Sequence, residues 1–117
     1  MTRRAARTDA NQRRLVEWLR AVGCLVEVIS DVGRGVPDLL CFDPQAGVIF
    51  LVEVKDGAQR PGALRARQSL TEAERMFHLA WQDAPIYIIN SEETAMTMLA
   101  EIRRSRPWHG ATRTGEM

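Results

Sequence analysis

The chain has 117 residues, enough for one domain with a single core and too few for two. Apolar residues make up 45% and charged residues 26% of it, as in ordinary globular proteins, and no apolar run approaches the ~18 residues of a membrane span. The basic N-terminus has no apolar segment behind it, so we expect no secretory signal and a cytoplasmic location. Cys24 and Cys41 are then expected to be two buried thiols, with a disulfide or a metal pair as the alternative.

The net charge of +1 hides an uneven distribution of basic residues. Residues 1–20 carry six arginines against Asp9 and Glu17, and residues 55–67 carry four basic residues against Asp56 alone. Such a distribution on a nearly neutral body favours a polyanionic partner, although arginine-rich surfaces are common in proteins of other kinds.

The first half of the chain predicts a helix followed by three strands. A helix over 9–23 has apolar residues at helical spacing, Asp9 or Asn11 as a cap, and Gly23 to end it. The expected strands are residues 24–29, 36–42 and 47–55, with a glycine-bearing loop before the second strand and a hairpin turn before the third.

The second half begins with residues 56–69, which lack periodicity and which we interpret as a functional loop. An amphipathic helix over 70–81 follows, then a strand over 84–90 and a helix over 91–104 that Ser91 is expected to cap. The first of these helices is predicted to bury Ala73, Met76, Phe77, Ala80 and Trp81. The predicted order α-β-β-β-α-β-α indicates an α/β domain over 9–104, with a mixed sheet flanked by helices, a basic arm over 1–8 and a disordered tail over 105–117.

One charged cluster is predicted at the end of the hairpin. Side chains alternate between the two faces of a strand, so Glu53 and Lys55, the only lysine of the chain, share a face. A four-residue loop over 44–47 would pair Asp43 with Val48 and therefore place Asp38 opposite Glu53. The alternative reading, that these residues are only the solvated end of a sheet, stays open at this point.

Two carboxylates at that distance repel unless a proton or a cation lies between them. Magnesium typically binds through one or two carboxylates, and it can lower the pKa of a bound water and stabilise charge on a phosphate. A compact ammonium such as that of Lys55 can orient or deprotonate the attacking water, whereas a guanidinium cannot give up its proton. This difference offers a reason for the single lysine.

Pro37-Asp38 followed by Glu53-Val54-Lys55 resembles the signature of the PD-(D/E)XK nuclease superfamily. The segments over 9–23, 32–42, 50–57 and 69–81 together resemble the virus-type replication-repair nuclease (VRR-NUC) family, whose small stand-alone members occur in bacteriophages. The resemblance covers about Asp9 to Leu99. It implies a restriction-endonuclease-like fold, a homodimer, and a location in the cytoplasm of a bacterial host if the chain is phage-encoded.

The resemblance also implies roles for individual residues. Asp38, Glu53 and the backbone carbonyl of Val54 would ligate Mg²⁺ or Mn²⁺, and Lys55 would act on the attacking water. Many family members carry a glutamate where this chain has Gln12, which could still hold a ligand water. Glu74 is expected to contact Lys55 or a ligand water, to form a capping box with Thr71, or to do both.

The resulting expectation is a metal-dependent endonuclease for DNA, with branched or flap-bearing DNA as its substrate. The candidate phosphate contacts are Arg34, Arg60, Arg65 and Arg67, each with an ordinary surface role as the alternative. Two other classes compete: a non-catalytic DNA-binding module, favoured by the departure at Gln12, and a small interaction protein whose carboxylates are incidental.

Overall fold

The computed structural model describes residues 3–56 and 70–105, with side chains from residue 9 onward within those ranges. Most of the predicted loop, including Arg60, Arg65 and Arg67, lies outside the described residues, as does the tail beyond Ser105. No helix in the described part of the chain is both long and apolar enough to cross a membrane.

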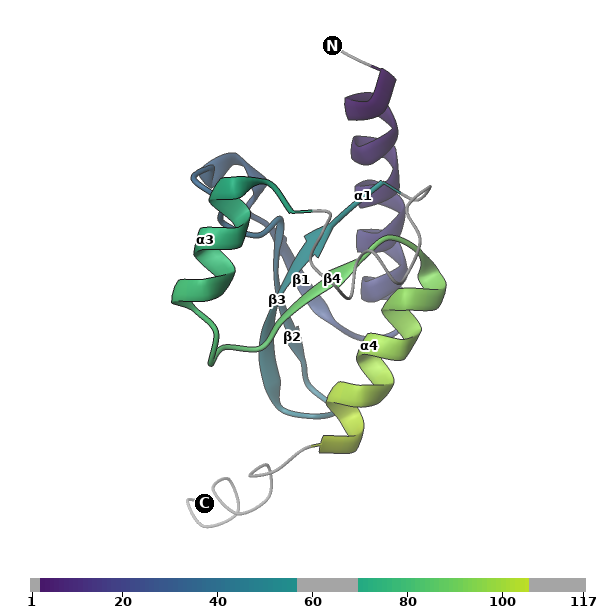
Figure 1. Ribbon diagram of the computed structural model, residues 1–117. Helices are drawn as coiled ribbons and strands as arrows, with labels where there is room; N and C mark the ends of the chain where they lie inside the picture. The colour runs from purple at the N-terminus through teal and green to yellow at the C-terminus, as the bar shows by residue number, and fades with distance from the viewer. Residues whose placement is uncertain (1–2, 57–69, 106–117) are drawn as a thin grey trace.

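The protein is an α/β fold built on a mixed four-stranded sheet in the order β1-β2-β3-β4. The strands are β1 (Leu25–Val28), β2 (Leu39–Asp43), β3 (Val48–Val54) and β4 (Ile86–Ile89). The helices are α1 (Arg3–Ala21), a short 3-10 turn η1 (Ser30–Val32), α3 (Glu72–Ala80) and α4 (Glu92–Ser105). Strand β2 is antiparallel to both β1 and β3, and β4 runs parallel to β3. Figure 1 shows α1 and α4 on one side of the sheet and α3 on the other.

The core lies between the sheet and the layer of α1 and α4. Strand β3 turns Phe50, Val52 and Val54 into it, whereas Ile49 on the opposite face is 62% exposed. The helices contribute buried apolar residues at helical spacing, namely Leu15, Val16 and Leu19 from α1 and Ala95, Met98, Leu99 and Ile102 from α4. The face of β3 that carries Glu53 and Lys55 is therefore the one turned toward α3.

The predicted hairpin register is confirmed. Asp43 pairs with Val48, and the ladder continues to the pair of Leu39 and Val52. One further step along this ladder places Asp38 opposite Glu53, as the length of the turn predicted. The register matters because a shift of one residue would move every side chain of a strand to the other face.

The expected start of the first helix is wrong. Helix α1 begins at Arg3, so residues 3–8 form its first turns, and Asp9 and Asn11 lie inside it and do not cap it. Its end is close to the prediction, since Gly23 has a φ of +105° and the next N–H bonds back to the carbonyl of Leu19. Ser91 caps α4 as expected, because its Oγ accepts the N–H of Thr94 at 3.1 Å. Ser105, placed in the tail by the sequence, is the last residue of α4.

The predicted burial of α3 is also wrong. Ala73, Met76, Ala80 and Trp81 are exposed, Phe77 is partly buried, and the buried residue of the helix is His78. The physical reason is that α3 is the one helix of the described ranges 3–56 and 70–105 that covers this side of the sheet, so no second described helix completes a core around its apolar stripe (Figure 1). The rings of Phe77 and Trp81 instead stack on each other, with centroids 4.9 Å apart.

Candidate active site

Asp38 is held at the open end of the hairpin, directly before β2. Its Oδ2 accepts the N–H of Val54 at 2.8 Å, and its backbone carbonyl accepts the N–H of Ile29 at 2.7 Å. The carboxylate therefore occupies the position that the next ladder bond between β2 and β3 would have taken. This contact fixes Asp38 beside the end of β3.

Glu53 is a buried carboxyl on the face of the sheet that α3 covers. It is only 3% exposed, and its Oε2 lies 3.5 Å from Nζ of Lys55. Its Oε1 is buried and has no hydrogen-bond partner among the described residues. A buried carboxylate oxygen without a partner costs free energy unless the carboxyl holds a proton or a cation lies beside it.

Lys55 reaches from the end of β3 to the start of α3. Its Nζ donates to Oε1 of Glu74 at 2.6 Å, and its side chain is 12% exposed. The same Oε1 accepts the N–H of Thr71 at 2.9 Å, and Oγ1 of Thr71 accepts the N–H of Glu74, which completes a capping box. Glu74 thus both forms the capping box with Thr71 and contacts Lys55, the two roles predicted for it.

The start of α3 is fixed against the loop that precedes Asp38. Residues Gly33, Arg34 and Gly35 all have positive φ, of 76°, 56° and 82°. A Cβ on Gly35 would lie 2.2 Å from the backbone oxygen of Ala73, so only glycine permits this approach. The close contact places Glu74 within reach of Lys55.

The pKa values of the three carboxyls reflect their crowding. Burial, together with the negative charges of Asp38 and Glu74, raises the pKa of Glu53 from 4.5 to about 9. Burial also raises the pKa of Asp38, because it outweighs the hydrogen bonds from the Val54 N–H and with Glu53. Burial acts in the same direction on Glu74, but hydrogen bonds from Lys55 and Thr71 prevail and lower its pKa. The crowding therefore favours the protonated form of Glu53 in the metal-free protein.

The residues present fit a hard divalent cation. The described residues contain no group of three His, Cys, Asp or Glu side chains placed to hold a metal by themselves. Magnesium, however, needs only one or two carboxylates and completes its shell with water and substrate oxygens. Asp38 and Glu53 supply two carboxyls, and a bound cation would offset both the burial of Glu53 and the negative charges of Asp38 and Glu74 beside it.

Other predicted site residues lie further out. Gln12 is partly buried on α1, and no hydrogen bond joins it to Asp38, Glu53 or Lys55 among the described side chains. Arg34 is exposed in the glycine loop described above. Cys24 and Cys41 are free buried thiols, as expected.

The role of Asn11 was not predicted from the sequence, where this residue was a candidate helix cap. Its amide donates to the backbone carbonyls of Lys55 and Asn90. Its place at the polar end of an otherwise apolar helix stripe was the only signal available.

Comparisons of the chain with family models, with curated proteins and with solved structures find no match.

Proposed function

We propose that this protein is a metal-dependent endonuclease that hydrolyses DNA phosphodiesters, with a PD-(D/E)XK fold of the VRR-NUC type. The observation that carries the proposal is the buried carboxyl of Glu53. One of its oxygens has no partner among the described residues, and it lies beside Asp38 and the only lysine of the chain. An incidental sheet end would leave these groups in water instead of burying them.

The proposed cation is Mg²⁺ or Mn²⁺, held by the carboxylates of Asp38 and Glu53 and by the backbone carbonyl of Val54. When bound, the cation would lower the pKa of a water molecule and neutralise the charge that develops on the phosphate. The protein fixes both carboxylates before substrate arrives, since Asp38 is bonded to the Val54 N–H and Glu53 is enclosed beneath α3. Such preorganisation lowers the cost of reaching the transition state.

Lys55 is proposed to donate from its ammonium to the attacking water or to the phosphate oxygens. Glu74 holds that ammonium beside Glu53 through the 2.6 Å contact and is itself held by the capping box. Arg34, which is exposed in the glycine loop that packs on the start of α3, is proposed to contact a DNA phosphate, as are Arg60, Arg65 and Arg67 outside the described residues. Branched or flap-bearing DNA as the substrate, and a homodimer as the working form, come from the family resemblance.

The test is cleavage of a labelled four-way junction and of a linear duplex during titration with Mg²⁺ or Mn²⁺. We expect wild-type protein to cut the junction only with metal present. Asp38→Ala and Lys55→Ala should lose at least ~100-fold in rate while still binding DNA, because they remove groups that stabilise the transition state. Lys55→Arg should fail as well, since a planar guanidinium does not fit in the place of a compact ammonium.

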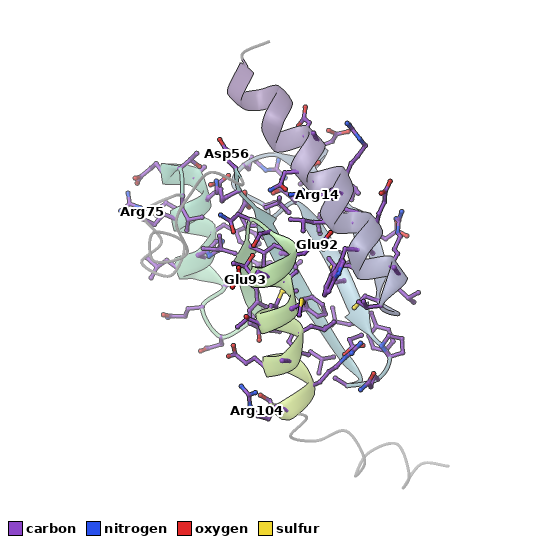
Figure 2. All side chains as sticks on the ribbon, turned by 90° about the vertical axis from the view of Figure 1, so that its right-hand side faces the viewer. Arg14, Asp56, Arg75, Glu92, Glu93 and Arg104 are labelled. Atoms are coloured by element: carbon purple, nitrogen blue, oxygen red, sulfur yellow. The ribbon has the colours of Figure 1, made fainter. Side chains whose placement is uncertain are left out.

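A matched control is Arg104→Ala, which removes an exposed charge at the far end of α4 and should retain cleavage (Figure 2). Tight DNA binding without metal-dependent cleavage by wild-type protein would contradict the proposal and favour a non-catalytic DNA-binding module. The absence of any DNA binding that weakens with salt would instead favour a small interaction protein.

A further inference from the structure

Asn11 joins helix α1 to the ends of the two parallel strands, β3 and β4. Its Nδ2 donates to the backbone carbonyl of Lys55 at 2.8 Å and to that of Asn90 at 2.9 Å, and the residue is only 7% exposed. Both contacts span long stretches of sequence, of 44 and 79 residues. A single side chain thus connects three elements that are remote along the chain.

The orientation of this amide is fixed by its own bonding pattern. The two N–H groups face two carbonyl oxygens, and Oδ1 accepts a hydrogen bond from the guanidinium of Arg14. Turning the amide over would set an oxygen against two carbonyls and an NH₂ against a guanidinium. Arg14 on α1 and Asp56 beyond β3 lie at the same end of the molecule, away from Arg104 (Figure 2).

The bonded carbonyls lie where the sheet ends. The last pair of the parallel ladder is Val54 with Ile89, after which the N–H of Lys55 still donates to the carbonyl of Ile89 at 2.9 Å. The carbonyls of Lys55 and Asn90 come directly after this point, where strand pairing no longer fixes the backbone. Asn11 bonds both segments there, and the amide of Asn90 adds a longer bond of 3.4 Å to the carbonyl of Asp56.

Lys55 is therefore held from both sides of the sheet. Asn11 bonds its backbone carbonyl from the α1 side, and Glu74 bonds its ammonium from the α3 side. We propose that Asn11 is a positioning residue, which fixes the backbone of Lys55 so that its ammonium stays beside Glu53. The effect on reaction rate rests on the proposed nuclease function, whereas the effect on the position of Lys55 does not.

Asn11→Asp is the sharpest test, because aspartate has the same shape but cannot donate to the two carbonyls. Asn11→Ala removes both donors without adding a charge, and it provides the same test if the aspartate variant does not fold. In either variant we expect kcat for junction cleavage to fall ~10- to 100-fold with KM nearly unchanged, as for a small misplacement of a catalytic group. The expected pattern differs from general destabilisation, which would lower the amount of active enzyme and not its rate per folded molecule.

The single lysine provides a second measurement, which does not depend on DNA cleavage. In protein labelled with ¹³C-lysine, the Cε–Hε NMR signal reports Lys55 alone. We expect this signal to move toward its position in unfolded protein in both Asn11 variants. Arg103→Lys, which perturbs a contact between α4 and Asp43, is the control for lost stability and should leave the signal in place.

Two outcomes would overturn the positioning role: a lysine signal that does not move in either variant, or wild-type kcat in both variants. If wild-type protein cuts no DNA, the proposed function fails, and the lysine signal still decides whether Asn11 positions Lys55. The two failures are therefore distinguishable.

Discussion

Replacing Glu53 with glutamine is expected to abolish cleavage and, in the same variant, to make the metal-free protein more stable at pH 8. Cleavage should fall ~1000-fold, because a lost metal ligand removes several kcal/mol of stabilisation from the charged transition state. Stability should rise because glutamine keeps the shape of the protonated side chain, and the variant no longer has to take up a proton when it folds at pH 8. A loss of activity together with a gain in stability would show that Glu53 lowers the stability of the protein and is needed for cleavage.

The sign of the stability effect follows from the pKa of Glu53. This pKa is about 9 in the folded protein against an ordinary value of 4.5. Between these values the unfolded chain has released a proton that the folded chain still holds, so stability falls as pH rises from 4.5 to 9. Asp38, whose pKa is also raised, adds a decrease of the same sign, and Glu74, whose pKa is lowered, opposes it. For Glu53 the total is on the order of a few kcal/mol.

The measurement is urea unfolding of wild-type and Glu53→Gln protein with a chelator present, from pH 5 to pH 9. The wild-type free energy of unfolding should decline more steeply with pH than that of the variant. Glu27→Gln makes the same chemical change at an exposed position of β1 and is the matched control. If the free energy of unfolding varies with pH in the same way in wild type and Glu53→Gln, the pKa of Glu53 is not raised by folding.

Replacing Arg103 with methionine is expected to cause a large loss of stability without a loss of rate per folded molecule. Asp43 is fully buried and accepts from Nε and a terminal nitrogen of Arg103 at 2.9 and 3.1 Å. The same guanidinium donates to the carbonyl of Val22 at 3.2 Å. The pair therefore joins α4, the hairpin and the end of α1, at the opposite end of β2 from Asp38.

Methionine would leave the carboxylate of Asp43 buried without its cation, which typically costs ~3–5 kcal/mol. The lower end applies here, because the side chain of Arg103 is 26% exposed and water already reaches the pair. With ~4–8 °C lost per kcal/mol in a domain of this size, Tm should fall by at least about 10 °C. Thermal and urea unfolding, together with cleavage rates corrected for the folded fraction, give the measurement.

The double variant Arg103→Met with Asp43→Asn separates the lost ion pair from lost packing. Removing the uncompensated charge should recover most of the stability. A decrease below ~1 kcal/mol in the single variant would mean that the pair contributes no more than a surface salt bridge. A double variant as unstable as the single one would place the effect in packing.

The sequence predicted the hairpin well because local chemistry determines it. The length of the turn fixed the register, and alternation along β3 then placed Glu53 and Lys55 on one face and Asp38 opposite them. Thr71 and Glu74 form a capping box within one helical turn, so that element was also readable from local spacing. These features need no knowledge of which elements pack together.

The features that the sequence did not predict depend on packing between remote elements. The apolar stripe of α3 predicts a buried face, but burial needs a second surface, and α1 and α4 both lie on the other side of the sheet. Met76 is therefore 55% exposed and Trp81 51% exposed. The role of Asn11 likewise depends on two backbone carbonyls that come from different strands. No spacing within α1 could have indicated them.

The central claim is that a divalent cation binds between Asp38 and Glu53, next to Lys55. Manganese is paramagnetic, so substoichiometric Mn²⁺ bound there should broaden the single lysine side-chain signal of ¹³C-lysine protein. Excess Mg²⁺ should restore the signal, and Glu53→Gln protein should show no broadening at the same Mn²⁺ concentration. A lysine signal that stays sharp with one equivalent of Mn²⁺ in wild-type protein would contradict the account.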